Sequence, residues 1–279
     1  MLSNIVDIKH PCFSLKCNRY GRIHLPVSPY CNISCVFCDR HSDACEERPG
    51  VSNKLLTPQE ALTVLRKAMS LSNNITVVGI AGIGDSLASE HAFCTFRLIN
   101  SEFPDLIKCM STNGLLLPYC IDEIVDIGIK TLTVTVNSIN PYILSRLCEN
   151  VNINGHVYYG IEGAKILVEN QLDGISKITQ KGIIVKVNSV LVPGINDDEI
   201  PIVSKHVKQA GAILHNITPL IPSGKLKHHP KPTCEQLDKV RCESEKFITV
   251  FRNCHQCRAD AIGIPGTDDI RKLVYQQCL

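Results

Sequence analysis

Short runs rich in β-branched residues recur along this 279-residue chain, and segments with helical periodicity lie between them. Strands that alternate with helices form βαβ units, whose crossovers are right-handed and whose strands lie parallel in one sheet. The pattern therefore predicts an α/β fold with its chemistry at the carboxyl ends of the strands. The predicted strands are 22–28, 75–82, 106–112, 131–137, 183–192 and 212–218.

Several helices have recognisable starts. Thr57-Pro-Gln-Glu60 is a capping box with proline at the first helical position, and apolar residues follow it at helical spacing. Thr233-Cys-Glu-Gln236 and Asn196-Asp-Asp-Glu199 begin two more helices. Segment 156–181 also has a helical pattern, although three glycines interrupt it. Segment 221–233 is rich in proline, glycine and lysine, which predicts a mobile loop whose two histidines are solvated.

Polar or sulfur-containing residues gather where the predicted strands end. They are Gly82 to Asp85, Cys109 to Gly114, Asn137, Asn188 and Asn216. Such residues at the carboxyl ends of parallel strands are typical of a binding site. Turn formation is the alternative, because Asn, Asp and Gly favour turns in any protein.

Charge and hydropathy argue against two classes of partner. The formal net charge is +2 and the basic residues form no stripe, so nucleic-acid binding is not indicated. No apolar run reaches the length of a membrane span, and Asp7 interrupts the start where a secretory signal would need an apolar core. We therefore expect no nucleic-acid partner, no membrane partner and a cytoplasmic location.

Cysteine is the unusual component, with 15 residues spread through long periodic segments. Disulfide frameworks are typical of short secreted chains, so this usage indicates a reducing compartment and metal ligation. Free cysteine is also a common core residue. We expect that role for Cys94, Cys120 and Cys148, which lie in apolar patterns that look helical.

Three cysteines, Cys31, Cys35 and Cys38, fall within eight residues after the first predicted strand, and no fourth follows at ligand spacing. A closed zinc site needs four protein ligands, and a [4Fe-4S] cluster usually takes four cysteines. Three thiolates therefore leave one iron open to a ligand that is not protein. The alternative is a chance group of buried cysteines.

This Cys-x3-Cys-x2-Cys motif, with Phe37 before its last cysteine, resembles the radical S-adenosylmethionine (SAM) superfamily. The resemblance implies a partial (βα)6 TIM-like barrel in which SAM binds the fourth iron through its amino and carboxylate groups. Reduction of that cluster then yields a 5′-deoxyadenosyl radical. Gly82-Ile83-Gly84-Asp85 stands where the superfamily holds the SAM amino group. The expected cofactor-binding residues are Gly82, Gly84, Asp85, Thr112, Asn113, Asn137 and Asn188.

A set of further motifs is similar, in the same order, to the NifB family of nitrogenase cofactor maturases. The motifs are HPCFS (10–14), RIHLPVSPYCNISCVFC (22–38), ERPGV (47–51), CMSTNG (109–114), VKVNSVLVPGIND (185–197), LHNITPLIP (214–222) and CHQCRADAIG (254–263). The resemblance is to the short form without a carrier domain. It implies one radical SAM domain with an N-terminal extension over 1–21, the partial barrel over 22–220 and a C-terminal extension over 221–279. Both extensions are expected to close over the strand ends.

The family resemblance implies two more [4Fe-4S] clusters, which are substrates. One would be held by His24, Cys45 and Cys109, and the other by Cys12, Cys254 and Cys257. Incomplete coordination suits a substrate, because such a cluster is easier to release. The alternatives are that His24 is a core or rim histidine and that Cys254-x2-Cys257 is half of a zinc site.

The family reaction fuses the two clusters with a SAM-derived carbide and a sulfur into an eight-iron precursor. Its implied partners are iron–sulfur cluster donors and the carrier and scaffold proteins of nitrogenase assembly, and we expect a monomer. Two other functions stay open. One is a radical SAM enzyme with a single auxiliary cluster acting on an organic or peptide substrate, and the other is a non-enzymatic cluster carrier.

The chain departs from the family pattern in two places. It has Gly82-Ile83-Gly84-Asp85-Ser86 where the family has Gly-Pro-Gly-Asp-Pro, and the spacing around Cys45 is shifted by one residue. Glu46 or Glu47 could serve as an oxygen ligand near that shift. These changes leave room for a divergent paralogue that acts on a related cluster. We also expect Arg258 and Asp260 to position the C-terminal segment, unless they form an ordinary surface ion pair.

Overall fold

The computed structural model describes residues 8–14, 19–267 and 269–278. Residues 1–7, at which we looked for a secretory signal, lie outside this part of the chain, as do residues 15–18 of the expected N-terminal extension. Within the described residues, no helix combines the length and the apolar character that crossing a membrane requires.

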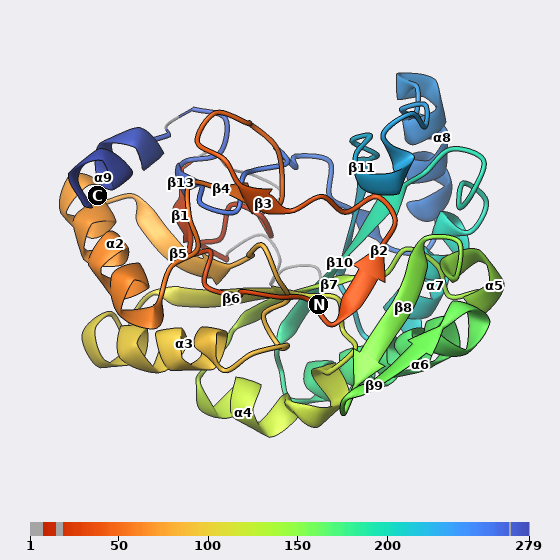
Figure 1. Cartoon of the computed structure of the whole chain (residues 1–279), viewed down its shortest axis with the longest axis horizontal. Coiled ribbons are helices and arrows are strands. Elements are labelled where there is room, and N and C mark those ends of the chain that lie inside the picture. Colours follow the sequence, from red (N-terminus) through yellow and green to blue (C-terminus); the bar gives the residue numbers. More distant parts are fainter. Residues whose placement is uncertain (1–7, 15–18, 268, 279) are drawn as a thin grey trace.

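One curved sheet carries six parallel strands, which confirms the α/β prediction and each of the six predicted strands (Figure 1). The first strand is shorter than predicted, because Pro26 has no N–H to donate to a neighbouring strand. The parallel strands are β1 (Gly21–His24), β5 (Ile75–Ile80), β6 (Ile107–Thr112), β7 (Thr131–Thr135), β10 (Ile184–Leu191) and β11 (Leu214–Pro219).

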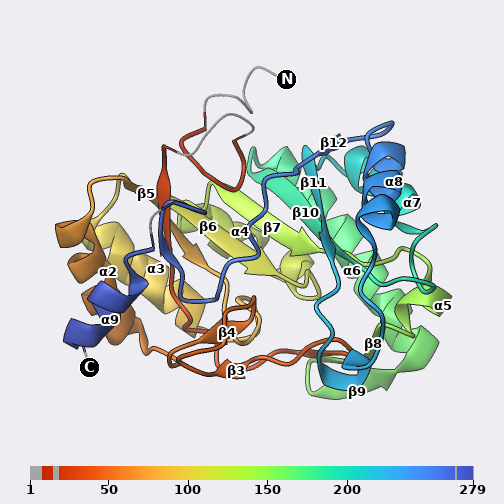
Figure 2. The ribbon, with the colours of Figure 1, turned by 90° about the horizontal axis from the view of Figure 1, so that it is seen from above.

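Two short strands extend the sheet at its two edges. β12 (Thr249–Val250) pairs in parallel with β11, and β13 (Ile262–Gly263) pairs antiparallel with β1. The intervening segment 251–261 therefore connects the two edges of the partial barrel, and Figure 2 shows this blue segment crossing the molecule. The C-terminal extension thus closes the side of the barrel. Two-residue strands of this kind carry no periodic signal in the sequence.

Helices cover the outer face of the sheet and enclose the main apolar core (Figures 1 and 2). The capping box at Thr57 is confirmed, since Thr57 Oγ1 accepts from Glu60 N at 3.2 Å and Glu60 Oε2 accepts from Thr57 N at 2.8 Å. The helices are α2 (Pro58–Leu71), α3 (His91–Glu102), α4 (Ile121–Asp126), α5 (Pro141–Leu144), α6 (Gly160–Gln180), α7 (Ile200–Gln209), α8 (Cys234–Ser244) and α9 (Arg271–Cys278), with 3-10 turns η1 (Leu117–Tyr119) and η2 (Gly224–Leu226).

The prediction of one helix over 156–181 is wrong for its first four residues. Residues 156–159 form β9 (His156–Tyr159), which pairs with β8 (Cys148–Ile153) in a hairpin. The turn between them is Asn154-Gly155, and both residues have positive φ, 53° and 79°. An Asn-Gly turn of this type matches the twist of a hairpin, so the turn overrides the helical pattern until Gly160.

A smaller sheet and a strand pair lie beside the barrel. β2 (Ile33–Cys35) pairs antiparallel with β8, so part of the three-cysteine loop is anchored in the sheet β2-β8-β9. β3 (His41–Ser42) pairs with β4 (Val51–Ser52). The expected helical position of Cys148 is wrong, because this residue lies in β8, but its burial is confirmed. Cys94 and Cys120 are only partly buried.

Candidate active site

The three-cysteine loop lies at the carboxyl end of β1. Cys31 and Cys38 are exposed and Cys35 is partly buried, and all three are free thiols. Cys38 N donates to Cys35 O at 3.1 Å, which folds the loop back on itself. The pKa of Cys35 lies well above its ordinary value because of a hydrogen bond with Cys148, burial, and the nearby charges of Cys38 and Cys31. The loop therefore gathers the three predicted catalytic thiols.

The glycine turn packs directly on the chain that enters this loop. Gly84 N donates to Ser28 O and Asp85 N donates to Tyr30 O, both at 2.9 Å. A Cβ atom at Gly84 would lie 2.0 Å from Tyr30 O, so no side chain fits at this position. We had expected the glycines to allow close approach of a ligand. At Gly84 the close approach is to the backbone of the cysteine loop itself.

Arg40 joins the cysteine loop to the glycine turn from the other side. Its Nη1 donates to Gly82 O at 3.0 Å and to Gly84 O at 3.2 Å. These bonds fix the two carbonyl groups next to the three thiols. Sequence reasoning missed Arg40, because a single arginine two residues after a cysteine motif carries no distinctive spacing signal.

Asp85 organises the ends of β5 and β6. Its buried carboxylate accepts from Thr112 Oγ1 at 2.9 Å, Asn113 N at 2.6 Å and Leu87 N at 2.9 Å. Burial raises the pKa of Asp85, and these hydrogen bonds partly oppose that shift. The carboxylate is thus occupied by protein donors. Asp85 and Thr112, both predicted to bind cofactor, act on the site by positioning Asn113.

Asn113 links Asp85 to the cysteine loop. Its Nδ2 donates to Asn32 Oδ1 at 2.7 Å and lies 3.5 Å from Cys31 Sγ. Gln171 Nε2 supports it from α6 by donating to Asn113 O at 2.7 Å. The pKa of Cys31 is raised because the surrounding protein displaces water from around the sulfur and because the Asp85 charge lies nearby. The structure therefore brings Asn113, as predicted, to the edge of the thiol group.

The two other predicted asparagines differ in their freedom. Asn137 is buried and its Oδ1 accepts from Val190 N at 2.9 Å, so its oxygen holds the backbone of β10. Asn188 is half-buried and pairs with Asn216, whose Nδ2 donates to Asn188 Oδ1 at 3.0 Å. Asn216 Oδ1 is buried and has no hydrogen-bond partner. This Asn188–Asn216 pair can therefore still accept a hydrogen bond from a polar ligand.

Segment 221–226 packs against the cysteine loop. Ser223 Oγ donates to Phe37 O at 2.7 Å, and Lys225 N donates to Val36 O at 2.8 Å. Gly224 has a φ of 55°, and a Cβ atom there would lie 2.8 Å from both Val36 O and Cys38 O. The loop that the sequence predicted to be mobile thus has several contacts that fix it beside the thiols. No composition signal distinguishes Gly224 from an ordinary turn glycine.

The inner face of the sheet places His24 and Cys109 on either side of Gly79. Strand register pairs His24 with Gly79 and Gly79 with Cys109, so the two side chains stand about two strand spacings, roughly 10 Å, apart at the backbone. A Cβ atom at Gly79 would lie 3.2 Å from His24 Cδ2. The missing side chain leaves room between the two predicted ligands.

His24 is oriented as a metal-binding histidine would be. Its Nδ1 lies 3.2 Å from Arg258 O, so Nδ1 carries the proton and Nε2 is left as an acceptor. Burial lowers the pKa of His24 to about 4, and the nearby Arg22 charge adds to that effect. The imidazole is therefore neutral near pH 7, which is the form that binds metal.

Cys45, the third predicted ligand of this site, lies on an exposed loop. Its N–H donates to Asp43 Oδ1 at 2.7 Å. Arg258 ties the loop to His24, because its Nη2 donates to Asp43 O at 2.9 Å and its Nη1 donates to Glu46 O. The structure thus connects the Cys45 loop to His24 through one arginine.

Arg258 and Asp260 confirm the predicted positioning of the C-terminal segment. Their side chains are 2% and 0% exposed and lie 2.9 Å apart, so they are not a surface ion pair. Asp260 Oδ2 also accepts from Asn53 N at 2.6 Å. The two glutamates considered as oxygen ligands are already paired. Glu47 binds Arg271 at 2.5 Å, and Glu46 binds Arg48 at 2.5 Å.

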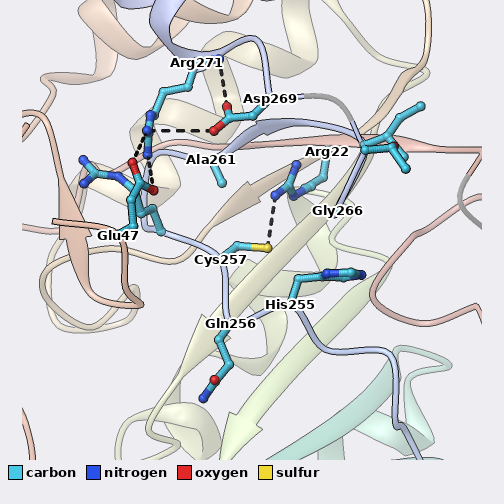
Figure 3. A pocket seen from close by; sticks show the side chains of 12 residues that line it. Arg22, Glu47, His255, Gln256, Cys257, Ala261, Gly266, Asp269 and Arg271 are labelled. Atoms are coloured by element: carbon cyan, nitrogen blue, oxygen red, sulfur yellow. Dashed lines mark hydrogen bonds and ion pairs between the residues drawn. The ribbon is translucent and has the colours of Figure 1, made fainter. Parts of the chain in front are cut away.

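Cys12 and Cys257 come together deep in the barrel, beside Cys109. The pKa of Cys12 is raised to about 12 by burial, against the effect of Lys186, with smaller contributions from Cys257 and Cys109. Cys257 Sγ accepts from Arg22 Nη2 at 3.0 Å (Figure 3). Cys254, the third predicted ligand, has Arg241 among its neighbours instead. A cavity of about 420 Å³ lies beside Cys257 and is also lined by Arg22, Glu47 and Arg271.

Residues 8–14, which carry Cys12, lie at the amino end of the strands, whereas His24 is the last residue of β1. Residues 8–14 contact the first residues of the strands, since Thr76 Oγ1 donates to Lys9 O and Phe13 packs with Val77 and Leu214. The N-terminal extension therefore closes the end of the barrel opposite the cysteine loop. The physical reason is the apolar Phe13, which is buried against the strand starts.

Among the described residues, no three His, Cys, Asp or Glu side chains stand close enough to hold a single metal ion. The zinc alternative for Cys254-x2-Cys257 thus finds no further ligands in this part of the chain. Ligands of a cluster stand further apart than those of one ion, because each binds a different iron. The free thiols and the room at Gly79 fit a cluster better than a mononuclear site.

Comparison with known proteins identifies the family. The profile of the Radical SAM superfamily matches residues 25–206. The FeMo cofactor biosynthesis protein NifB of Methanocaldococcus jannaschii is 50% identical over 258 residues, which cover 91% of this chain and 86% of that protein. NifB of Klebsiella pneumoniae is 42% identical over 268 residues, covering 93% of this chain and 57% of that protein.

Solved structures agree on the fold. A radical SAM methyltransferase from Sphaerobacter thermophilus superposes with a TM-score of 0.60 at 17% identity, covering 82% of this chain and 65% of that one. The sheet described above is therefore the partial barrel of radical SAM enzymes, whose superfamily uses a [4Fe-4S] cluster and SAM. The chain belongs to the NifB family of FeMo cofactor biosynthesis proteins and is a radical SAM enzyme.

Proposed function

We propose that this enzyme fuses two [4Fe-4S] clusters, with a SAM-derived carbide and one sulfur, into an eight-iron precursor of the nitrogenase cofactor. The observation that carries this proposal is the second group of thiols and imidazole inside the barrel. Cys109, Cys12 and Cys257 lie together there with His24, away from the exposed cysteine loop. An enzyme with a single auxiliary cluster and an organic substrate would need only part of this set of metal ligands.

The resident cluster would be held by Cys31, Cys35 and Cys38, and with SAM it supplies a methyl group and a 5′-deoxyadenosyl radical. The protein's own contribution is order at the edge of this site. Asn113 Nδ2 stands near Cys31 Sγ, and the Asn188–Asn216 pair offers an unpartnered carboxamide oxygen. The Asp85 carboxylate accepts hydrogen bonds from three protein groups and so holds the residues that follow β5 and β6 beside the loop.

The first substrate cluster would bind between His24 and Cys109, in the space left by Gly79. His24 Nε2 is available as the ligand because Nδ1 is committed to Arg258 O. The Cys45 loop, held by the same Arg258, would supply the third ligand after a small rearrangement. A ligand on an exposed loop suits a cluster that must be released once it has reacted.

The second substrate cluster would bind Cys12 and Cys257, with Cys254 as the third ligand. These thiols come from the two ends of the chain, so cluster binding would cross-link residues 8–14 to segment 251–261. Burial keeps the thiol of Cys12 protonated when no metal is bound, because it raises the pKa of Cys12 to about 12. Ligation must therefore expel that proton, as metal binding to thiols generally does.

One further function is supported by a specific observation. Cys45 lies on an exposed loop, and among the described residues no three His, Cys, Asp or Glu side chains stand close enough to hold one metal ion. An enzyme with one auxiliary cluster and an organic or peptide substrate would need fewer ligands than the chain offers. Iron content separates the two functions, since roughly twelve irons correspond to three cubane clusters and roughly eight to two.

The test of the proposal is anaerobic incubation of the reconstituted enzyme with methyl-labelled SAM and dithionite. We expect label to be retained in an eight-iron cluster that can be extracted from the protein. Release of deoxyadenosine without labelled cluster would contradict the proposal and favour an organic substrate. The partners of this function, namely cluster donors and the carrier and scaffold proteins of nitrogenase assembly, would deliver the substrates and collect the product.

A further inference from the structure

Lys186 is a buried cation without a carboxylate partner. It is 5% exposed, on the inner face of β10. Its Nζ donates to Cys12 O at 3.0 Å and lies 4.8 Å from the ring centre of Phe13 and 5.2 Å from that of Phe251. None of the ion pairs among the described residues includes Lys186. A carbonyl and two aromatic faces compensate the charge only in part.

Arg22 is a second such cation, two residues before His24. It is 5% exposed, and its Nη1 and Nη2 donate to Gly263 O and Cys257 Sγ. Its Nε is buried and has no hydrogen-bond partner. In the part of the chain that the structure describes, none of the ion pairs includes Arg22. Figure 3 shows the guanidinium of Arg22 beside Cys257.

His10 adds an unused donor to the same place. It is 2% exposed, and Cys12 N donates to its Nδ1 at 3.0 Å. The neutral ring therefore carries its proton on Nε2. That Nε2 is buried and has no hydrogen-bond partner. Electrostatic coupling of His10 to Lys186 and His24 shows that the ring lies among the residues of the inner group.

These observations share one physical problem and one solution. A buried charge is strongly unfavourable unless an opposite charge compensates it, and a buried N–H needs an acceptor. Cations with incomplete partners therefore call for an anion that binds between them. Both cations touch a predicted ligand, Lys186 through Cys12 O and Arg22 through Cys257 Sγ. A [4Fe-4S] cluster on thiolates is such an anion, and its sulfides accept hydrogen bonds.

We propose that Arg22, Lys186 and His10 form an electrostatic seat for the substrate cluster that binds Cys12 and Cys257. Arg22 and Lys186 balance its negative charge, and His10 donates Nε2–H to one of its sulfur atoms. They are positioning residues that select an anionic cluster over a free metal cation. This inference rests on the proposed function, because it assigns a charge environment to one of the two substrate sites.

The test compares Lys186→Met with the matched variant Lys108→Met. Lys108 is also a buried strand lysine, 6% exposed, and its Nζ donates to Pro104 O at 3.3 Å. It lies next in sequence to Cys109 but is separate from the seat, since successive strand residues face opposite sides of a sheet. Removing a positive charge disfavours the reduced, more negative state of a nearby cluster. The readouts are the midpoint potential of that cluster, from a redox titration followed by electron paramagnetic resonance, and the rate of iron loss to a chelator.

We expect Lys186→Met to shift the midpoint potential of one cluster to a more negative value. We also expect iron loss from that cluster to become about tenfold faster, which corresponds to about 1.4 kcal/mol. The affected signal is assigned by its absence in Cys257→Ala. Lys186→Arg should stay near the wild type, and Lys108→Met should leave the potential unchanged. An unchanged potential and iron loss in Lys186→Met would overturn the proposal.

Two further arms keep the result interpretable. If Lys186→Met does not fold, Arg22→Gln makes the same test at the second cation, with the same expected shift and the same contradicting outcome. Wild-type iron content separates the two proposals. If the wild type never binds a cluster that depends on Cys257, the proposed function fails along with the seat. If the wild type binds such a cluster but its midpoint potential is unchanged by substitution of either cation, only the proposed electrostatic seat is wrong.

Discussion

The cysteine loop and the barrel interior hold sulfur ligands in different ways. At the carboxyl end, the cysteine loop presents Cys31 and Cys38 at the surface and is fixed by backbone hydrogen bonds from the glycine turn and from segment 221–226. In the barrel interior, Cys109 is buried and Cys12 is partly buried, and the buried cations Lys186 and Arg22 stand beside the thiols. An open site suits a resident cluster that must meet SAM, and an enclosed charged site suits an anionic substrate.

The largest expected effect distinguishes the cysteine loop from the inner ligands. Cys38→Ala removes one of three ligands of the resident cluster, so reductive formation of deoxyadenosine should fall to background. The inner ligands are untouched and should still bind their clusters. Iron analysis and deoxyadenosine chromatography on the same sample check both statements. Full deoxyadenosine formation by Cys38→Ala would show that the loop does not hold the resident cluster.

The inner ligands should show the reverse pattern. Cys109→Ala should abolish the labelled eight-iron product while deoxyadenosine is still formed, because the radical is generated at the cysteine loop. Cys94→Ala is the matched control, since Cys94 is a partly buried cysteine in helix α3 and is not one of the predicted ligands. The account fails at this point if Cys109→Ala makes labelled product at the wild-type level.

Gly79 sharpens the comparison by testing space alone. Gly79→Ala places a methyl group 3.2 Å from His24 Cδ2 and should lower occupancy of the first substrate cluster several-fold. The same change at Gly84 acts on stability instead, because its Cβ would lie 2.0 Å from Tyr30 O. Overpacking of that kind destabilises by about 1–3 kcal/mol. Mössbauer spectra and thermal unfolding, measured for both variants, should give opposite rankings.

The smallest expected effect concerns His215 in β11, part of the sheet that carries both groups of ligands. His215 is held between Ser189 Oγ at 2.8 Å and Ser204 Oγ at 2.7 Å, and burial lowers its pKa to about 3. The unfolded chain takes up the proton near pH 6.5, so this contribution to stability is present above pH 6.5 and is lost as pH falls towards 3. Between pH 7.5 and 5.5 the loss should be about 1.4 kcal/mol. Denaturant unfolding of the wild type against His215→Gln measures it, and equal pH slopes would contradict the assignment.

The carboxyl end was largely predictable from sequence, because its ligands lie within eight residues and its strands alternate with helices. Two local predictions were wrong because one sequence signal overrode or hid another. The Asn154-Gly155 turn overrode a helical pattern, and Gly224 looked like any turn glycine.

The barrel interior was less predictable, for a physical reason. Its arrangement depends on strand register, which brings His24, Gly79 and Cys109 side by side although they are far apart in sequence. Lys186 and Arg22 are single basic residues in strands, with no spacing signal. Only the fold shows that they are buried and that they stand beside thiols. Cys45 and Cys254 stay predictions taken from the family.

The most direct test of this account is the iron content and Mössbauer spectrum of the anaerobically reconstituted enzyme, with and without Cys31, Cys35 and Cys38. The account predicts roughly twelve irons in the wild type as three cubane clusters, falling to roughly eight when the three cysteines are replaced by alanine. Roughly four irons in the wild type, and none after the replacement, would mean that the ligands in the barrel interior hold no cluster.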